Sequence, residues 1–530
     1  MAVTESVSGD TAGDIAGGTT GGAAGVTAGG AAEGRGPTGA GTGGFLGGVR
    51  ESGRADRPED GPADARADGP EGGRGGAHPG YEGILRRQAA RESSARTYAR
   101  ALPIVPVRAR GLTIEGADGR RYLDCLSGAG ALALGHNHPV VLEAVRAVLD
   151  SGAPLHALDL ATPVKDAFVT ELFHTLPPGL ADHARVQFCG PAGTDAVEAA
   201  LKLVRTATGR TGILSFTGAY HGMTAAAQDA SGHATDVRAT RLPYPYDYRC
   251  PFGTGGETGA ELAARWTEYL LDDPRSGVPT PAAMILEPVQ GEGGVIPAPD
   301  PWLRRMRQIT ADRSIPLIAD EIQTGVGRTG AFWAVEHSGI TPDVMVLSKA
   351  IGGSLPLAVV VYRDDLDAWE PGAHAGTFRG NQLAMVAGTA TLAYVRRHRL
   401  ADHAAALGTR MLTQLRTLAD RFPCIGDVRG RGLMIGLEVV DPEREAAETT
   451  HRPVPRAPRP AAPGLAAAIR RECLRRGLIV ELGGRHASVV RLLPPLTITD
   501  EQASAVLDRL ADAVEAVARG TADRPGRPNP

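Results

Sequence analysis

The chain has 530 residues, a formal net charge of −4 and only 4% aromatic residues. This length exceeds what one hydrophobic core usually holds, so we expect two domains and a tail. The charge excludes the basic surface that nucleic-acid-binding proteins present. No apolar run approaches the ~20 residues that a membrane-spanning helix needs. The five cysteines are scattered, with no histidine at metal-ligand spacing, which indicates reduced thiols, no metal site and a cytoplasmic protein.

Two parts of the chain have the composition of irregular segments. Residues 1–80 are dominated by Gly, Ala, Thr and Ser and then by Arg, Asp and Gly, so they bury too little apolar surface to fold. The first residues lack the basic and apolar regions of a signal peptide. Residues 451–463 are rich in proline, which predicts an exposed loop. We therefore expect disordered tails over 1–80 and 521–530.

Between these segments, short apolar runs alternate with stretches of helical periodicity. Strands are expected at Arg185–Cys189, Gly212–Phe216, Ala282–Glu287, Ile315–Asp320, Asp343–Ser348 and Leu355–Tyr362, and helices at Thr194–Thr206 and Pro301–Asp312. Because the apolar runs are continuous, they indicate strands buried on both faces, as in a mostly parallel sheet covered by helices. Such sheets bind ligands at the carboxyl ends of their strands, so the residues that follow each run are the candidates for a site.

The first candidate loop, Gly190-Pro-Ala-Gly193-Thr194, connects a predicted strand to an amphipathic helix. Its glycines allow a sharp turn and a close backbone approach, and Thr194 is a good N-cap. Free N–H groups and the helix dipole make such a start an anion-binding site. An ordinary strand-to-helix turn explains the same pattern, since the Walker phosphate-binding pattern is absent.

The next two strand ends carry an aromatic residue and two acids. Tyr220, followed by His221, can stack on a planar ring. His221 is equally well explained as a catalytic residue or as a hydrogen-bonded structural histidine. Glu287 and Glu292 follow the third predicted strand, where they either orient a substrate or cap a loop.

Two further strand ends carry an acid and an amine. The fourth run ends in Asp320-Glu-Ile322-Gln323, and Lys349 follows the fifth. An isolated lysine at such a position is usually a solvated surface residue. A lysine amine and a buried acid, each at the end of its own strand, are nevertheless what pyridoxal phosphate (PLP) chemistry needs. The amine forms a Schiff base with the aldehyde, and the acid keeps the pyridine nitrogen protonated.

The last two candidates lie in the second half of the chain. The segment that begins Thr377-Phe-Arg379-Gly is polar, contains glycine and precedes a helix, which suits a second phosphate or carboxylate contact. Arg491 ends a strand-like run just before two prolines, so it suits bidentate binding of a substrate carboxylate. A surface ion pair is the alternative explanation for Arg491 taken alone.

In this order, the segments resemble the class III (ω-amino acid) aminotransferases of PLP fold type I, from about Ser94 to about Ala516. Each motif is short, but the ordered set is specific. The resemblance implies an α/β fold, with a mostly parallel sheet covered by helices in a large PLP-binding domain over 161–394. It also implies a smaller α+β domain built from both chain ends, over 81–160 and 395–520.

The resemblance also assigns a role to each candidate. Lys349 matches the Schiff-base lysine, and Asp320 matches the partner of the pyridine nitrogen. The other matches contact cofactor or substrate: Tyr220 and Ile322 on the two ring faces, His221 beside Tyr220, Gln323 near the phenolic oxygen, Gly193 and Thr194 at the phosphate, Thr377 at the phosphate of the neighbouring subunit, Arg491 at the α-carboxylate, and Glu292 as the acid that pairs with this arginine when a diamine is bound. The role of Thr377 implies a homodimer with shared sites.

One departure from the broad family indicates a branch. The usual Thr-Phe-Gly-Gly-Asn-Pro is here Thr-Phe-Arg379-Gly-Asn-Gln, and together with Ser127–Pro139 and Pro243–Phe252 it resembles the diaminobutyrate–2-oxoglutarate aminotransferases. Arg379 thus becomes a substrate-binding candidate. That branch interconverts L-2,4-diaminobutyrate and 2-oxoglutarate with L-aspartate 4-semialdehyde and glutamate, and we expect ping-pong kinetics. An ω-aminotransferase for ornithine, 4-aminobutyrate or lysine is the first alternative, and a fold-type-I aminomutase is the second.

Overall fold

The computed structural model describes residues 81–232, 239–444 and 458–522, apart from the side chains of residues 521 and 522. The predicted tail 1–80, residues 523–530 of the other predicted tail and most of the proline-rich loop lie outside these residues. The start of that second tail is wrong, because Thr521 and Ala522 belong to helix α12 (Asp500–Ala522). No helix within the described ranges is long and apolar enough to cross a membrane. The described residues all belong to one compact unit, Gly73–Pro530.

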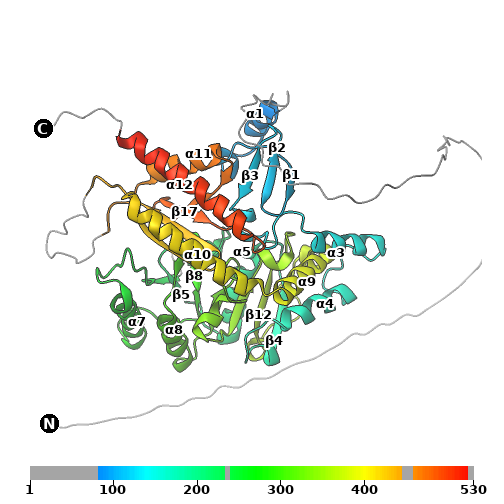
Figure 1. Cartoon of the computed structure of the whole chain (residues 1–530). Coiled ribbons are helices and arrows are strands. Elements are labelled where there is room, and N and C mark those ends of the chain that lie inside the picture. Colours follow the sequence, from blue (N-terminus) through cyan, green and yellow to red (C-terminus); the bar gives the residue numbers. More distant parts are fainter. Residues whose placement is uncertain (1–80, 233–238, 445–457, 523–530) are drawn as a thin grey trace, which may run out of the picture. The chain divides into compact units, whose positions relative to one another are not determined.

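A seven-stranded sheet forms the framework of the larger part of the fold (Figure 1). Its order is β4-β12-β11-β10-β7-β5-β6, and its antiparallel pairs are those that β12 makes with β11 and β4. The strands are β4 (Ala184–Phe188), β5 (Ile213–Phe216), β6 (Ala239–Leu242), β7 (Ala283–Leu286), β10 (Leu317–Asp320), β11 (Val344–Leu347) and β12 (Val359–Arg363). The mostly parallel sheet that the apolar runs predict is therefore confirmed.

Helices cover both faces of this sheet, which is why every residue of β7, β10 and β11 is buried. Alternate residues of β11 face different layers. Val344 and Val346 pack in the core cluster that contains α5, whereas Met345 and Leu347 pack in the cluster that contains α4, α8 and α9. The helices of this part are α3 (Pro139–Asp150), α4 (Pro163–Phe173), α5 (Gly193–Thr208), α6 (Ala225–Ser231), α7 (Gly256–Asp272), α8 (Asp300–Asp312) and α9 (Gln382–Arg397).

The smaller part of the fold combines the two ends of the described chain. In the sheet β1-β2-β3-β15, the C-terminal strand β15 pairs in parallel with β3. A second, antiparallel sheet has the order β13-β14-β17-β16, and α11 packs against three of its strands. The elements are α1 (Tyr81–Arg91), α2 (Tyr98–Ala101), β1 (Pro106–Arg110), β2 (Thr113–Gly116), β3 (Arg121–Asp124), α10 (Leu400–Arg421), β13 (Ile425–Arg431), β14 (Met434–Val439), α11 (Pro463–Arg475), β15 (Leu478–Ile479), β16 (Glu481–Gly483), β17 (Val489–Leu492) and α12 (Asp500–Ala522).

The remaining strands and the charges complete the description. The hairpin of β8 (Val289–Gln290) and β9 (Ile296–Pro297) follows β7. Every strand that the sequence predicts in the large sheet is present with shifted ends. The sequence does not predict β6, because its four residues include a threonine and an arginine.

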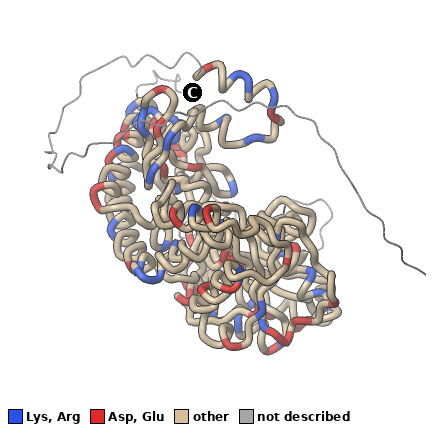
Figure 2. The backbone as a smooth tube through the Cα atoms, turned by 90° about the vertical axis from the view of Figure 1, so that its right-hand side faces the viewer, with Lys and Arg blue, Asp and Glu red and all other residues tan. Residues whose placement is uncertain are grey.

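Figure 2 shows basic and acidic residues interspersed along the described backbone, as expected for a net charge near zero.

Candidate active site

The carboxyl ends of neighbouring strands bring most of the predicted residues together. Asp320 ends β10, Lys349 follows β11, and Tyr220 follows β5. Because β10 pairs in parallel with β11 and β7, and β7 pairs with β5, these ends meet at one edge of the sheet. They border a cavity of about 270 Å³, which is lined by Ala192, Gly193, Thr194, Tyr220, His221, Gly222, Met223, Glu287, Glu292, Asp320, Ile322, Gln323, Thr324 and Lys349.

Lys349 occupies an unusual backbone position at this edge. Its φ is 50°, in the left-handed region that residues with a side chain rarely adopt. It opens the short 3-10 helix η4 (Lys349–Gly352), which packs against α9. Burial lowers the pKa of the Lys349 amine, and no hydrogen bond or ion pair joins it to another described residue. A lowered pKa increases the share of the neutral amine, which is the form that reacts with a carbonyl or acts as a base.

Asp320 is held by a buried histidine. His221 Nδ1 lies 2.6 Å from Asp320 Oδ2, and the backbone N–H of Ile322 donates to Asp320 Oδ1 at 3.1 Å. Burial acts against the charged imidazole, but the hydrogen bond and the charge of Asp320 raise the pKa of His221. The histidine and the backbone N–H therefore orient the carboxylate, as a group that must face a protonated ring nitrogen has to be oriented. His221 Nε2 is buried without a partner in the described residues.

Glu287 supports the same edge from β7. Its two carboxyl oxygens accept the backbone N–H groups of Tyr220 and Gly291, each at 2.9 Å. Burial raises the pKa of Glu287 to about 7. The acid therefore fixes the loop that carries Tyr220, which lies at the cavity wall with 37% of its surface exposed.

The start of α5 and the loop after Tyr220 form a tight cradle. Thr194 Oγ1 lies 2.5 Å from Thr224 Oγ1, and a Cβ on Gly222, whose φ is 125°, would overlap the Thr194 side chain. A Cβ on Gly193 would lie 3.0 Å from Ile322 Cδ1. Only glycine permits such a close approach of the backbone at these two positions. The first N–H groups of α5 border the cavity here, and such groups bind a phosphate well.

The expected N-cap of α5 is wrong. The helix begins at Gly193 and its N-cap is Ala192, two positions earlier than a Thr194 cap allows. The carboxylate of Asp195 accepts the Ala192 N–H at 2.9 Å and so replaces the threonine in this role. The Thr194 hydroxyl is thereby left to face Thr224 and the cavity.

Arg491 is fully buried in β17 and is surrounded by acceptors. Its Nη1 lies 2.7 Å from Glu292 Oε1 and 3.3 Å from Glu481 Oε2, and its Nη2 donates to Gln323 Oε1 at 3.0 Å. Burial opposes ionisation of all three charged groups. The nearby guanidinium nevertheless lowers the pKa of Glu292, whereas that of Glu481 stays raised. Glu292 is therefore the stronger partner of Arg491.

Sequence reasoning missed Glu481. It is the direct cross-strand neighbour of Arg491 between β16 and β17, and its Oε1 accepts the hydroxyl of Tyr98 at 2.9 Å. A recognised hairpin over 481–491 would reveal the pairing, since opposed charges often occupy facing positions in antiparallel strands. Its turn, Gly484-Arg-His-Ala, carries no Asn-Gly or Asp-Gly signal.

Thr377 and Arg379 do not line the cavities that contain Lys349 in this chain. Thr377 opens the 3-10 helix η6 (Thr377–Gly380) on the surface. Arg379 forms an ion pair with Asp159 at 2.6 Å and donates to the carbonyl of His374 at 3.0 Å. The predicted contact of Thr377 with the phosphate of a neighbouring subunit and that of Arg379 with the substrate stay predictions.

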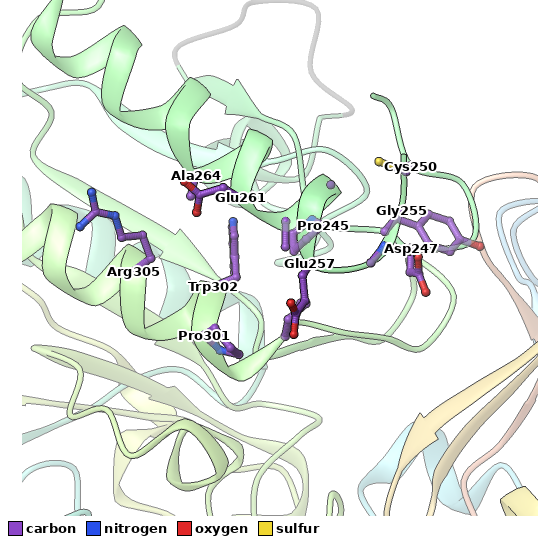
Figure 3. A pocket seen from close by; sticks show the side chains of 15 residues that line it. Pro245, Asp247, Cys250, Gly255, Glu257, Glu261, Ala264, Pro301, Trp302 and Arg305 are labelled. Carbon is purple, nitrogen blue, oxygen red and sulfur yellow. Dashed lines mark hydrogen bonds between the residues drawn. The ribbon is translucent and has the colours of Figure 1, made fainter. Parts of the chain in front are cut away.

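The described residues contain larger cavities that hold none of the predicted residues. Figure 3 shows one of about 620 Å³ between the starts of α7 and α8, with Trp302, Glu257 and Arg305 in its wall. No cluster of potential metal ligands occurs in the described part of the chain, and the five cysteines are unpaired. A reactive amine, an oriented carboxylate and an anion cradle occur together only around Lys349 among the described cavities, and this donor set fits PLP.

Comparisons with known proteins agree with this geometry. Residues 94–514 match the model of the family "Aminotransferase class-III". A diaminobutyrate–2-oxoglutarate aminotransferase of Rhizobium meliloti (strain 1021) is 55% identical over 446 residues, which cover 83% of this chain and 93% of the relative. A protein of the same name from Haemophilus influenzae is 46% identical, with 81% of this chain and 94% of the relative covered.

Solved structures show the same fold. An amine transaminase from an uncultivated Pseudomonas species, in its PLP-bound form, has a TM-score of 0.70 and 30% identity, and covers 81% of this chain and 98% of its own. An (S)-enantioselective ω-transaminase from Thermomicrobium roseum has a TM-score of 0.71 and 27% identity, and covers 82% and 98%.

Proposed function

We propose a specific reaction for this chain, which belongs to the class-III aminotransferase family: it is a PLP-dependent enzyme that exchanges the amino group between L-2,4-diaminobutyrate and 2-oxoglutarate. The products are L-aspartate 4-semialdehyde and L-glutamate. The observation that carries this proposal is the pairing of Arg491 with Glu292 beside Lys349. The names of the two relatives described above support the choice of substrate.

The chain's residues divide the binding of PLP among them. Lys349 Nζ would hold the aldehyde carbon, Asp320 would accept the ring N–H, and Thr194 with the start of α5 would hold the phosphate. PLP, when bound, supplies a ring that withdraws electrons from the substrate carbon. Tyr220 and Ile322 border the same cavity and would orient the ring plane, which decides the substrate bond that is broken.

Lys349 also moves the proton. With PLP bound, the Lys349 Nζ would take a proton from the substrate carbon that bears the reacting amine and would hold it for return. The lowered pKa of this amine favours its neutral, basic form near neutral pH. Asp320, oriented by His221, would stabilise the positive charge of the PLP ring nitrogen.

Arg491 and Glu292 let one site accept two unlike substrates. For glutamate, Arg491 leaves Glu292 and binds the α-carboxylate through two N–H groups. For diaminobutyrate, whose reacting end carries no carboxylate, the 2.7 Å ion pair stays closed and keeps the buried Arg491 paired.

The active unit is a homodimer in this proposal, because Thr377 contributes to the site only from a partner subunit. A group of large apolar side chains near Thr377 and the cavity is exposed in the single chain: Phe378 (66%), Leu160 (65%) and Met223 (63%). Exposed apolar residues of this size are typical of a surface that another subunit covers. The unpaired cysteines agree with a reducing, cytoplasmic location.

A panel of amino donors tests the proposed substrate. The purified holoenzyme is assayed with 2-oxoglutarate and diaminobutyrate, ornithine, lysine or 4-aminobutyrate, and the carbonyl product is identified. Diaminobutyrate should give the highest kcat/KM, aspartate 4-semialdehyde as product and parallel lines in double-reciprocal plots. A higher kcat/KM for another donor overturns the assignment.

A further inference from the structure

A second cavity, of about 460 Å³, also borders Lys349 and is not explained by the cofactor. Its wall includes Tyr98, Arg470 and Glu481 in addition to Tyr220, Glu292 and Lys349. Tyr98 lies in α2, Arg470 in α11 and Glu481 in β16, so this wall is built by the smaller part of the fold. A substrate that reacts at Lys349 would extend its far end into this space.

Glu481 gives this cavity an acceptor whose charge is incompletely compensated. One guanidinium, that of Arg491, faces both Glu292 at 2.7 Å and Glu481 at 3.3 Å. The Tyr98 hydroxyl donates a hydrogen bond to Glu481 Oε1, whereas Glu481 Oε2 is buried and has no hydrogen bond within the described residues. Two carboxylates around one cation leave room for a second cation, and an ammonium group supplies both the charge and the missing donor.

Arg470 supplies the opposite charge on the same wall. Its Nε is buried without a hydrogen-bond partner, and the guanidinium forms no ion pair with any described residue. Burial and the neighbouring charge of Arg471 lower its pKa, and the charge of Glu481 opposes this shift only in part. A carboxylate of the ligand would accept two parallel N–H hydrogen bonds from this guanidinium.

We propose that Glu481 and Arg470 form a subsite for the α-ammonium and α-carboxylate of a diamino acid whose terminal amine reacts at Lys349. The inference rests on the proposed function and deepens it. Both charges are needed to hold such an α-amino acid end. The subsite thereby distinguishes diaminobutyrate from 4-aminobutyrate, which lacks the α-ammonium, and from 1,3-diaminopropane, which lacks the carboxylate. Tyr98 is a positioning residue, because it fixes the Glu481 carboxylate.

The test compares the three donors within each variant of the holoenzyme. Stopped-flow half-reactions give kcat/KM for diaminobutyrate, 4-aminobutyrate and 1,3-diaminopropane in the wild type, Glu481→Gln and Arg470→Ala. The ratio of kcat/KM between two donors is insensitive to changes in folding, in PLP content or in the position of Arg491, because such changes affect both donors. Arg471→Ala is the matched control, since Arg471 is the exposed neighbour of Arg470 on the same helix.

We expect each variant to lose one preference. Glu481→Gln should reduce the preference for diaminobutyrate over 4-aminobutyrate by at least about tenfold, because a buried group built to bind the ammonium no longer discriminates. Arg470→Ala should reduce the preference over 1,3-diaminopropane by a similar factor. The control should keep both ratios.

The outcomes separate the two levels of the proposal. Unchanged ratios in both variants overturn the subsite, while a wild type that prefers diaminobutyrate still supports the proposed reaction. A wild type without that preference overturns the proposed reaction, and the subsite with it. A ratio lost equally in Arg471→Ala also overturns the subsite, since the effect is then not local to the two residues.

Discussion

At the scale of single residues, the site is organised by charges that lack water. Arg491 has no exposed surface, so the carboxylates beside it decide whether its charge is compensated. Burial lowers the pKa of Lys349 in the same way that it raises the pKa of Glu287. The charge of each of these groups is therefore controlled by its neighbours. Changing one neighbour should slow the half-reaction of one substrate more than that of the other.

Replacing Glu292 by alanine should impair the diamine half-reaction more than the glutamate half-reaction. Without Glu292, the buried Arg491 retains only its longer, 3.3 Å pairing with Glu481 when diaminobutyrate is bound, whereas glutamate supplies a further carboxylate. We expect a loss of about tenfold or more in the first half-reaction and a smaller loss in the second. Stopped-flow spectroscopy of each half-reaction measures both rates.

Glu261→Ala is a suitable control, because Glu261 is an exposed acid at a different cavity. It should leave both half-reactions unchanged. Equal losses in the two half-reactions of Glu292→Ala would contradict its role as a gate for Arg491.

Glu321, next to the Asp320 carboxylate in sequence, should make stability depend on pH. Burial raises its pKa from 4.5 to about 7 in the folded state. Its contribution to stability is therefore fully present below pH 4.5 and is lost as the pH rises through about 7. The glutamine of Glu321→Gln does not titrate. As the pH rises between these limits, the variant should therefore become more stable than the wild type by on the order of 2 kcal/mol.

Melting temperatures at pH 5 and pH 8, at fixed PLP concentration, check this expectation. The amide still accepts the Val335 N–H, which Glu321 binds at 2.9 Å, so the fold should persist. A difference between the two proteins that does not change with pH would contradict the assigned pKa.

How much of the site the sequence predicts depends on distance along the chain. Lys349 and Asp320 each directly follow an apolar run, so a local pattern marks them. Tyr98, Arg470 and Glu481 come from three elements that meet only through tertiary packing, and no local pattern marks any of them.

At the scale of elements, buried strands are the most predictable part of the fold. The continuous apolar runs of β7, β10 and β11 reflect burial on both faces, which leaves few alternatives to a central strand. The N-cap of α5 was harder to predict, because Asp195 accepts the Ala192 N–H and the helix then begins at Gly193, before the better capping residue Thr194.

The packing of α9 against the Lys349 turn gives a prediction at this scale. A Cβ on Gly388 would clash with the carbonyl oxygen of Ile351 in η4 and lie 2.9 Å from Phe168. Gly388→Ala should therefore destabilise the protein by about 2 kcal/mol, since overpacking forces the turn to move. Turnover should fall with it, because the turn carries Lys349.

Gly464→Ala is the matched control, because Gly464 lies in α11 with no atom within 4 Å of the added carbon. It should leave turnover unchanged and raise stability by up to about 1 kcal/mol, since alanine favours the helix. Thermal unfolding measures both variants. A Gly388→Ala protein as stable as the wild type would show that the turn adapts freely.

At the scale of the whole molecule, the assembly could not be predicted from packing within one chain. Thr377 lies exposed beside Phe378 and outside the cavity of Lys349. The predicted role of Thr377 depends on a partner subunit, which the family resemblance implies but the sequence pattern alone does not.

Mixing two inactive variants tests the shared site. Lys349→Ala lacks the reactive amine, and Thr377→Glu places a negative charge where the phosphate of the neighbouring site is proposed to lie. In a mixed dimer, one site carries both defects and the other carries neither. Unfolding and refolding the two together should restore roughly a quarter of wild-type turnover, because about half of the dimers are mixed.

Native mass spectrometry confirms that mixed dimers have formed. No recovery in their presence would place Thr377 at the site of its own subunit. Each variant refolded alone serves as the control and should stay inactive.

The central claim is that Lys349 performs the amino transfer, and its replacement by alanine tests this most directly. The chain has only three lysines, so Lys202→Arg provides a control that preserves charge. With diaminobutyrate and 2-oxoglutarate, Lys349→Ala should lose at least about a thousandfold in kcat, because both the carbonyl-binding amine and the base are gone. Lys202→Arg should retain wild-type turnover. A Lys349→Ala enzyme with turnover close to that of the wild type would contradict the account.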